Sequence, residues 1–222
     1  TILYISDSTT VSGAEHVMFH YLEHLRAPDF RTHVYFRRSN ERMQRALEAR
    51  GIPFTATEAF TDRIIRTTWR PGDLWSFARA FSRVRRELID LCQQHSVDVL
   101  HAISYPASLY TAFAAGALKR PQVWHEHNIK RIHAFNGPIY RWAAESCAHV
   151  IGPSDAVTNA LGAAGILPPR LHTVYNGIDL AKFVRSDADA ARVRAEFGVR
   201  DGQPAIGLVG QLLPYKGHKT LI

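Results

Sequence analysis

The sequence TILYISDSTTVSGAEHVMFHYLEHL, residues 1–25, combines a short apolar strand, a loop of small residues and a helix. The strand pattern runs to Ser6 and ends at Asp7. From Ala14 to Leu25, apolar residues recur with helical spacing. This stretch therefore predicts a strand that leads directly into an amphipathic helix.

The same alternation continues along most of the chain. Further strands are expected at 31–37, 52–56, 97–104, 121–127, 149–154 and 170–178, and helices at 41–50, 74–95, 106–118, 138–148 and 154–164. Because the strands are mostly continuous apolar runs, they predict an α/β fold, a doubly wound, Rossmann-like parallel sheet with helices on both faces. Ligands bind beyond the carboxyl ends of such strands, so the loops after Ser6, Ile103, His125 and Ile151 are expected to line one crevice.

The pattern changes near Asn176. A turn, a polar stretch and one helix at about 187–197 precede the apolar run AIGLVG, residues 205–210, which predicts a buried strand. Only a dozen residues follow, too few to supply that strand with neighbours. The sequence therefore predicts a first domain at 1–178, a linker with a helix at 179–202, and the truncated start of a second, similar domain at 203–222.

Composition and charge narrow the class of protein. The 222 residues are 46% hydrophobic and 21% charged, as in ordinary soluble globular proteins. No run approaches the roughly 18 apolar residues of a membrane-spanning helix. Cys92 and Cys147 lie in apolar helical patterns and are expected to be buried thiols, which fits a cytoplasmic protein.

Positive charge is concentrated between Arg26 and Arg86. This window holds fourteen arginines, no lysine and six acids, a balance of +8 against +7 for the whole chain. Such a surface can attract anionic lipid head groups, phosphorylated substrates or nucleic acid, and well-solvated helix faces would explain it equally. The segment 60–73, which contains Trp69, is expected to be an exposed, partly apolar loop.

Local motifs alone point weakly to function. The chain has neither a G-x-G-x-x-G loop nor a P-loop. Residues 210–218 contain a glycine turn, Lys216 and a helix start, where free backbone N–H groups and a cation could hold a diphosphate. His16, His20 and His24 share one helix face and are expected to face solvent rather than to bind zinc. Ser154 is expected to cap a helix.

Five segments in order resemble a known family. They are SGAE (12–15), HEHN (125–128), VIGPSDAVTNAL (150–161), VYNGIDLAKF (174–183) and LVGQLLPYKGHKTLI (208–222). In order and spacing they are similar to the family 4 retaining glycosyltransferases of GT-B fold. The resemblance implies an N-terminal, acceptor-side lobe and the start of a second, Rossmann-like lobe that binds a nucleotide sugar.

The resemblance also implies roles for particular residues. The matching positions are His127 as the catalytic residue, then Gly13, Glu15, His125, Asn128 and Asn176 for substrate binding, and Gly210, Gln211, Lys216 and Gly217 for the donor diphosphate. Two positions depart from the family pattern, because Ser12 replaces a glycine and Gln211 replaces an arginine. No metal and no cofactor are expected.

The implied activity is transfer of a sugar, of hexosyltransferase type and with retention, from a nucleotide-diphosphate sugar to a glycan or lipid-linked acceptor in polysaccharide biosynthesis. The 222 residues alone are expected to be inactive, because most of the donor site lies beyond Ile222. Docking on an anionic membrane, at the inner face, is a separate hypothesis. A sugar-nucleotide epimerase or phosphorylase of the same two-lobe architecture remains an alternative. A basic module that binds nucleic acid is the other alternative, disfavoured because interleaved aromatic residues are missing.

Overall fold

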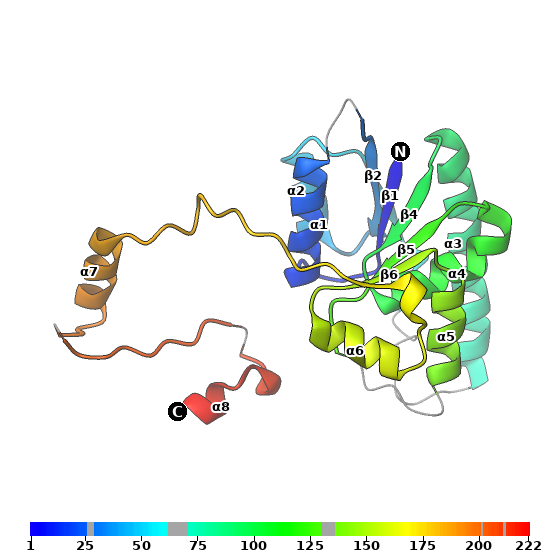
Figure 1. The fold of residues 1–222 in the computed structure, drawn as a ribbon. Coiled ribbons are helices and arrows are strands. Elements are labelled where there is room, and N and C mark those ends of the chain that lie inside the picture. Colours follow the sequence, from blue (N-terminus) through cyan, green and yellow to red (C-terminus); the bar gives the residue numbers. More distant parts are fainter. Residues whose placement is uncertain (26–28, 62–70, 130–135, 201, 211) are drawn as a thin grey trace. The chain divides into compact units, whose positions relative to one another are not determined.

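The computed structural model of the chain describes residues 1–25, 29–61, 71–129, 136–200, 202–210 and 212–222 (Figure 1). These residues form two compact units, Thr1–Gly177 and Ile178–Ile222, which are described separately below. The finer division at 178 and 202 remains a prediction. No helix within the described ranges is long and apolar enough to cross a membrane.

Unit 1, Thr1–Gly177, is built on one parallel sheet in the strand order β3-β2-β1-β4-β5-β6-β7. Every neighbouring pair is parallel, which confirms the predicted Rossmann-like fold. The strands are β1 (Ile2–Ser6), β2 (Thr32–Arg37), β3 (Phe54–Thr57), β4 (Val99–Ala102), β5 (Gln122–His125), β6 (His149–Gly152) and β7 (Leu171–Thr173). The last strand is shorter than predicted, because residues 174–178 are exposed and have no second strand beside them.

Helices cover both faces of this sheet, as expected. They are α1 (Gly13–His24), α2 (Glu41–Glu48), α3 (Pro71–Gln94), α4 (Tyr105–Leu118), α5 (Gly137–Glu145) and α6 (Asp155–Ala163), with a short η2 turn (Pro168–Arg170) before β7. Figure 1 shows α1 and α2 on one side of the sheet and α3, α4 and α5 on the other. Beyond α2, Gly51 has a φ of +62°, a left-handed conformation that suits glycine after the end of a helix.

Alternate residues of a strand pack into two separate hydrophobic cores, one on each face of the sheet. Leu3 and Ile5 of β1 pack among residues of α3 and α4, whereas Tyr4 between them packs against Met18 and Leu22 of α1. This period of two explains why the strands are apolar on both faces. Cys92 and Cys147 are buried free thiols, as predicted.

One glycine fixes how α6 meets the sheet. A Cβ added to Gly152 at the end of β6 would lie 2.6 Å from Thr158 Oγ1 and 3.1 Å from its backbone nitrogen. The Thr158 hydroxyl accepts a 2.9 Å hydrogen bond from Thr173 Oγ1 on β7. Ser154 caps α6 by accepting from the Val157 N–H, which confirms its predicted role.

Unit 2, Ile178–Ile222, contains α7 (Asp187–Glu196), a 3-10 turn η3 (Pro214–Lys216) and α8 (His218–Leu221). The strand predicted at 205–210 is wrong, because residues 203–209 have no regular secondary structure. Ile206 is 84% exposed and Val209 is fully exposed. An apolar run becomes a strand only where neighbours complete its hydrogen bonds, and the described part of unit 2 supplies none. Most of the loop predicted at 60–73 lies outside the described residues, and α3 begins at Pro71.

Candidate functional site

The candidate site lies at the carboxyl edge of the sheet between β1 and β4. From β1 the chain winds outward to β2 and β3, whereas from β4 it winds the other way to β5, β6 and β7. The loops after β1 and β4 therefore diverge, and a ligand-binding crevice forms at such a point in open α/β sheets. The predicted crevice loops after Ser6 and Ile103 are the two that border this point.

A hydrogen bond joins these two loops. Ser104 Oγ donates to Asp7 Oδ1 at 2.5 Å, and the same hydroxyl accepts from the Ala107 N–H to cap α4. Arg37 Nε donates to the Asp7 backbone carbonyl at 2.8 Å. Burial raises the pKa of Asp7, and the Ser104 hydrogen bond and Arg37 oppose that rise. Asp7 and Ser104 were not among the predicted site residues, although a carboxylate directly after an apolar strand is a usable signal.

Glu15 organises the start of α1. Its carboxylate accepts from Ser6 Oγ at 3.2 Å and from the Ser12 N–H at 2.8 Å. The Ser12 hydroxyl also donates to it, which completes the pairing of an N-cap residue with the third helical residue. Glu15 is buried, and its hydrogen bonds to Ser6 and Ser12 hold the loop before α1 in place. Its predicted contact with substrate remains a prediction.

Gly13, the first residue of α1, lies exposed beside Ser12. A Cβ built on Gly13 has no atom within 4 Å, and its backbone has no left-handed conformation that would require glycine. Neither packing nor strain among the described residues explains glycine here. The absence of a side chain leaves the first turn of α1 open to a bound group.

A row of rings crosses the sheet on the side covered by α1. Tyr4 stacks on His101 of β4 at 4.9 Å between centroids, His101 lies 5.8 Å from His125 of β5, and Tyr21 of α1 lies 6.0 Å from His125. Burial, with a smaller contribution from His127, lowers the pKa of His101 to about 4. Burial and the neighbouring imidazoles lower the pKa of His125 to about 2. Both rings are therefore neutral at physiological pH.

The row ends at His127, at the edge of the site. The His125 and His127 rings stack at 4.0 Å, which confirms that the two side chains point the same way. Burial lowers the pKa of His127, and the Glu15 carboxylate opposes this shift. His127 Nε2 has no hydrogen-bond partner among the described residues. A half-buried, neutral imidazole in this position can donate or accept one hydrogen bond. His101 was missed, although a histidine inside the apolar run of β4 marks it.

The remaining predicted residues of unit 1 lie farther along the chain. The Asn128 N–H donates to Glu126 Oε1 at 3.0 Å, while the Glu126 N–H bonds the Ile151 carbonyl at the end of β6. Asn128 therefore follows His127 on a turn fixed to β6, and it is exposed. Asn176 is exposed after β7, with no hydrogen bond to this group in the described structure. The structure thus brings Glu15, His125 and His127 together, and no described hydrogen bond joins Asn176 to them.

The predicted diphosphate residues belong to unit 2. Lys216 ends the η3 turn and is exposed, Gly217 has a φ of +79°, and α8 begins at His218. A Cβ on Gly210 would lie 3.9 Å from the His218 ring, an ordinary contact. Gln211 lies outside the described residues. The glycine turn before a helix start is therefore present, and its relation to unit 1 stays a prediction.

The three histidines of α1 lie on the outer part of the helix. His16 and His24 are exposed, and His24 Nδ1 lies 2.7 Å from the His20 carbonyl of its own helix. Among the described residues, no group of three potential metal ligands occurs.

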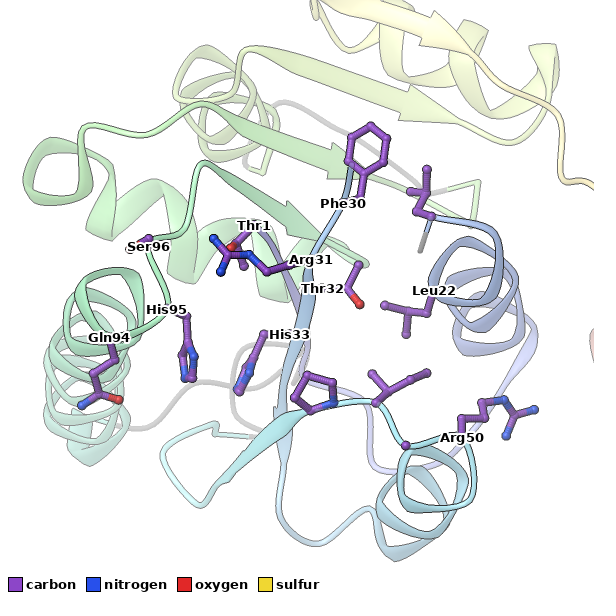
Figure 2. A pocket seen from close by; sticks show the side chains of 14 residues that line it. Thr1, Leu22, Phe30, Arg31, Thr32, His33, Arg50, Gln94, His95 and Ser96 are labelled. Carbon is purple, nitrogen blue, oxygen red and sulfur yellow. The ribbon is translucent and has the colours of Figure 1, made fainter. Parts of the chain in front are cut away.

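A cavity of about 540 Å³ lies at the opposite edge of the sheet (Figure 2). Figure 2 shows His33 of β2 and His95 facing each other in this hollow, and their rings stack at 4.2 Å. Burial lowers the pKa of His33 to about 4. The cavity borders Thr1 and Thr32, at the amino ends of β1 and β2, away from the edge where ligands of such sheets bind. It is therefore not the candidate site.

The fold and this crevice are those of one lobe of a GT-B glycosyltransferase. The model of Glycosyltransferase Family 4 matches residues 11–182, and the chain belongs to this family. No curated protein matches the sequence significantly.

Solved structures agree with this assignment. Alr3699/HepE from Anabaena in complex with UDP is 25% identical, with a TM-score of 0.66 over 89% of this chain and 50% of that chain. Its complex with UDP-glucose is 25% identical, with a TM-score of 0.64 over 90% and 50%. A glycosyltransferase from Rickettsia africae has a TM-score of 0.73 over 99% and 55% of the two chains, and at 15% identity it shows the fold alone. The chain therefore spans about half the length of these proteins.

Proposed function

We propose that the complete protein transfers a sugar from a nucleotide-diphosphate sugar to an acceptor, with retention of configuration. The family match and the likeness to HepE, which was crystallised with UDP and with UDP-glucose, support a nucleotide-sugar donor. The observation that carries the proposal is His127 after β5, an imidazole whose pKa is lowered by burial, which has the Glu15 carboxylate as an electrostatic neighbour, and whose Nε2 has no hydrogen-bond partner among the described residues. We further propose that the transferred sugar is a hexose.

The residues of unit 1 divide into two roles. His127 would hydrogen-bond the transferred sugar through Nε2, and the stack with His125 would hold its ring in that orientation. Gly13 would let the sugar or diphosphate approach the backbone of the first turn of α1. The hydrogen bonds of Glu15 to Ser6 and Ser12 would fix that turn before the donor arrives.

Unit 2 would supply the charge for the leaving group. Lys216 and the backbone N–H groups beside Gly217 would stabilise the negative charge of the departing diphosphate. We propose that this stabilisation lowers the reaction barrier more than any other interaction. Gly210 and Gln211 would line the same turn, and an amide in place of a guanidinium donates hydrogen bonds without adding charge. No metal and no cofactor enter this proposal.

The test uses a protein that carries a complete second lobe. Release of nucleoside diphosphate from a panel of nucleotide sugars is measured for the parent protein and for His127→Ala and His127→Gln. We expect kcat to fall by roughly 10²-fold in His127→Ala. The exposed His16→Ala is the matched control on α1 and should retain full activity.

The anomeric configuration of the product tests retention, and NMR of the first turnover reads it. An inverted product would refute retention alone. Full activity of His127→Ala would refute the role of His127. Formation of an epimerised nucleotide sugar, or dependence on inorganic phosphate, would replace the transferase by the epimerase or phosphorylase alternative.

We also propose that the acceptor is a glycan or is linked to a lipid, and that the protein works in the cytoplasm at the inner face of an anionic membrane. The arginines of α3 support this proposal. Arg79, Arg83 and Arg86 line one hollow on its outer side, and Arg79 and Arg86 are exposed there without an ion pair to a described acid.

A further inference from the structure

The outer surface of unit 1 has an apolar groove between α3, α4 and α5, with a volume of about 440 Å³. Its walls are built from Leu74, Phe77, Phe81, Phe113, Ile139 and Trp142. Four of these side chains are strongly exposed, from 44% for Trp142 to 70% for Leu74. Contiguous exposed apolar surface of this kind marks an interaction site rather than an incomplete core.

The groove exists because the three helices touch only through their inner residues. Phe81 of α3 stacks on Tyr110 of α4 at 4.5 Å, and Ala143 of α5 packs against Leu109 and Ala112 of α4. These contacts close the floor. Phe113 stands edge-on to Phe81 at 5.2 Å, so its ring forms part of the wall without filling the space above the floor. The exposed part of the walls is formed by Leu74, Phe113, Ile139 and Trp142, whose side chains present apolar surface to a ligand.

Positive charge borders the groove directly. Ser82 and Phe113 also line the adjoining hollow, whose other walls are Arg85, Arg86 and Ile89. Over residues 74–94, α3 carries four arginines against two acids, and one of these acids, Glu87, bonds Arg83, Tyr35 and Thr57. The end of the groove is therefore basic. A ligand that complements this surface has a hydrocarbon part for the groove and an adjacent negatively charged group for the arginines.

We propose that this surface, the groove with Arg85 and Arg86, docks unit 1 on a bilayer that contains anionic phospholipid. Hydrocarbon chains would enter the groove, and head-group phosphates would contact the arginines. Trp142 on the wall and Trp75, which directly follows the wall residue Leu74 and is 76% exposed, suit the membrane interface, where tryptophan is enriched. A second copy of the chain fits less well, because a symmetric contact would bring the arginines of two α3 helices together.

The position of the surface links it to the candidate site. Tyr105, which lines the groove, directly follows Ser104, whose hydroxyl bonds Asp7 at the divergence of β1 and β4. A lipid-linked acceptor held in the membrane would therefore meet the protein beside the carboxyl edge of the sheet. Only this last step rests on the proposed function, since docking itself requires no donor and no transfer.

The experiment is vesicle sedimentation with the 222-residue chain, using phosphatidylcholine vesicles with and without phosphatidylglycerol. We expect binding only with phosphatidylglycerol. The pair Arg85→Gln and Arg86→Gln should weaken it about twenty-five-fold, because each arginine near an anionic surface contributes about fivefold. Trp142→Ser should weaken it about tenfold by removing buried apolar surface. The matched control is Arg42→Gln with Arg45→Gln on α2, which removes the same charge from exposed positions on the other face of the sheet and should bind vesicles like the parent.

Three results would overturn the proposal. They are equal binding to both kinds of vesicle, equal loss in the α2 control, and an oligomer that Trp142→Ser dissociates without any vesicle binding. Circular dichroism of each variant shows whether it is folded, and Trp142→Phe, which keeps an aromatic ring, should restore most of the binding. With the complete protein, transfer to a soluble acceptor should be unchanged in the groove variants, so failure of docking and failure of the transferase proposal are separable.

Discussion

Replacing His125 by phenylalanine should flatten the dependence of stability on pH. Neither ring nitrogen of His125 has a hydrogen-bond partner among the described residues, and the side chain is fully buried. Phenylalanine can stack on His127 and Tyr21 in its place and carries no titratable group. The substitution therefore removes a proton-binding site while it keeps an aromatic ring in the row.

The sign follows from the two pKa values. Burial holds the pKa of His125 at about 2 in the folded chain, against 6.5 when the residue is unshifted. Below pH 6.5 the unfolded chain binds a proton that the folded chain does not, so stability is lost as the pH falls. The loss is about 1.4 kcal/mol per pH unit for one proton, or roughly 2 kcal/mol between pH 6.5 and 5. His101 and His33, with pKa values lowered to about 4, add losses of the same sign.

Urea unfolding followed by tryptophan fluorescence at a series of pH values measures this effect. The stability difference between parent and His125→Phe at pH 7.5 gives the packing cost of the substitution. At pH 5 the variant should have gained roughly 2 kcal/mol relative to that difference. Tyr4→Phe is the control in the same ring row, because burial raises the pKa of Tyr4 above 10 and its slope with pH should be unchanged. A parent-to-variant difference that stays constant from pH 7.5 to 5 would refute the reasoning.

Three further predictions concern packing, capping and thiol chemistry. Gly152→Ala should destabilise the chain by about 1–3 kcal/mol, since its Cβ would lie 2.6 Å from Thr158 Oγ1, and a Tm unchanged from the parent would contradict this. Ser154→Ala should lower the free energy of unfolding by about 1 kcal/mol, because it removes a helix cap. Ser104→Ala should lower it further, because the Ser104 hydroxyl caps α4 and also bonds Asp7. Equal losses of unfolding free energy in the two variants, measured in urea, would argue against the bond to Asp7. Burial raises the pKa of Cys147 to about 12, so iodoacetamide should label it only after urea unfolds the chain, and rapid labelling of the folded chain would be the contrary result.

The fold of unit 1 was predictable because its signals are local. Continuous apolar strands and amphipathic helices are read from neighbouring residues, and all seven strands were expected, each within a few residues of its observed position. The run at 205–210 shows the limit of this approach. Its composition is that of a buried strand, but a strand forms only beside another strand, and none of the described strands pairs with residues 203–209.

The candidate site was predictable only where a motif carried it. The HEHN segment pointed to both His125 and His127, whose rings stack in the structure. Asp7 and His101 were not predicted as site residues, because they lie in the site only through the order of the strands, which brings β1 next to β4. Ile2 pairs with Val99, and no local pattern encodes a contact over such a distance in sequence.

The pairing of β1 with β4 also has a consequence for how the protein folds. It splits the sheet into an early half, β1 to β3, and a late half, β4 to β7, and α3 is the connection that carries the chain from one to the other. Each half can be assembled from contacts between near neighbours, whereas their junction needs the closure of a loop of almost a hundred residues. Glu15 and His127 come from opposite halves. During synthesis the candidate site is therefore completed only at the late step in which the two halves of the sheet join.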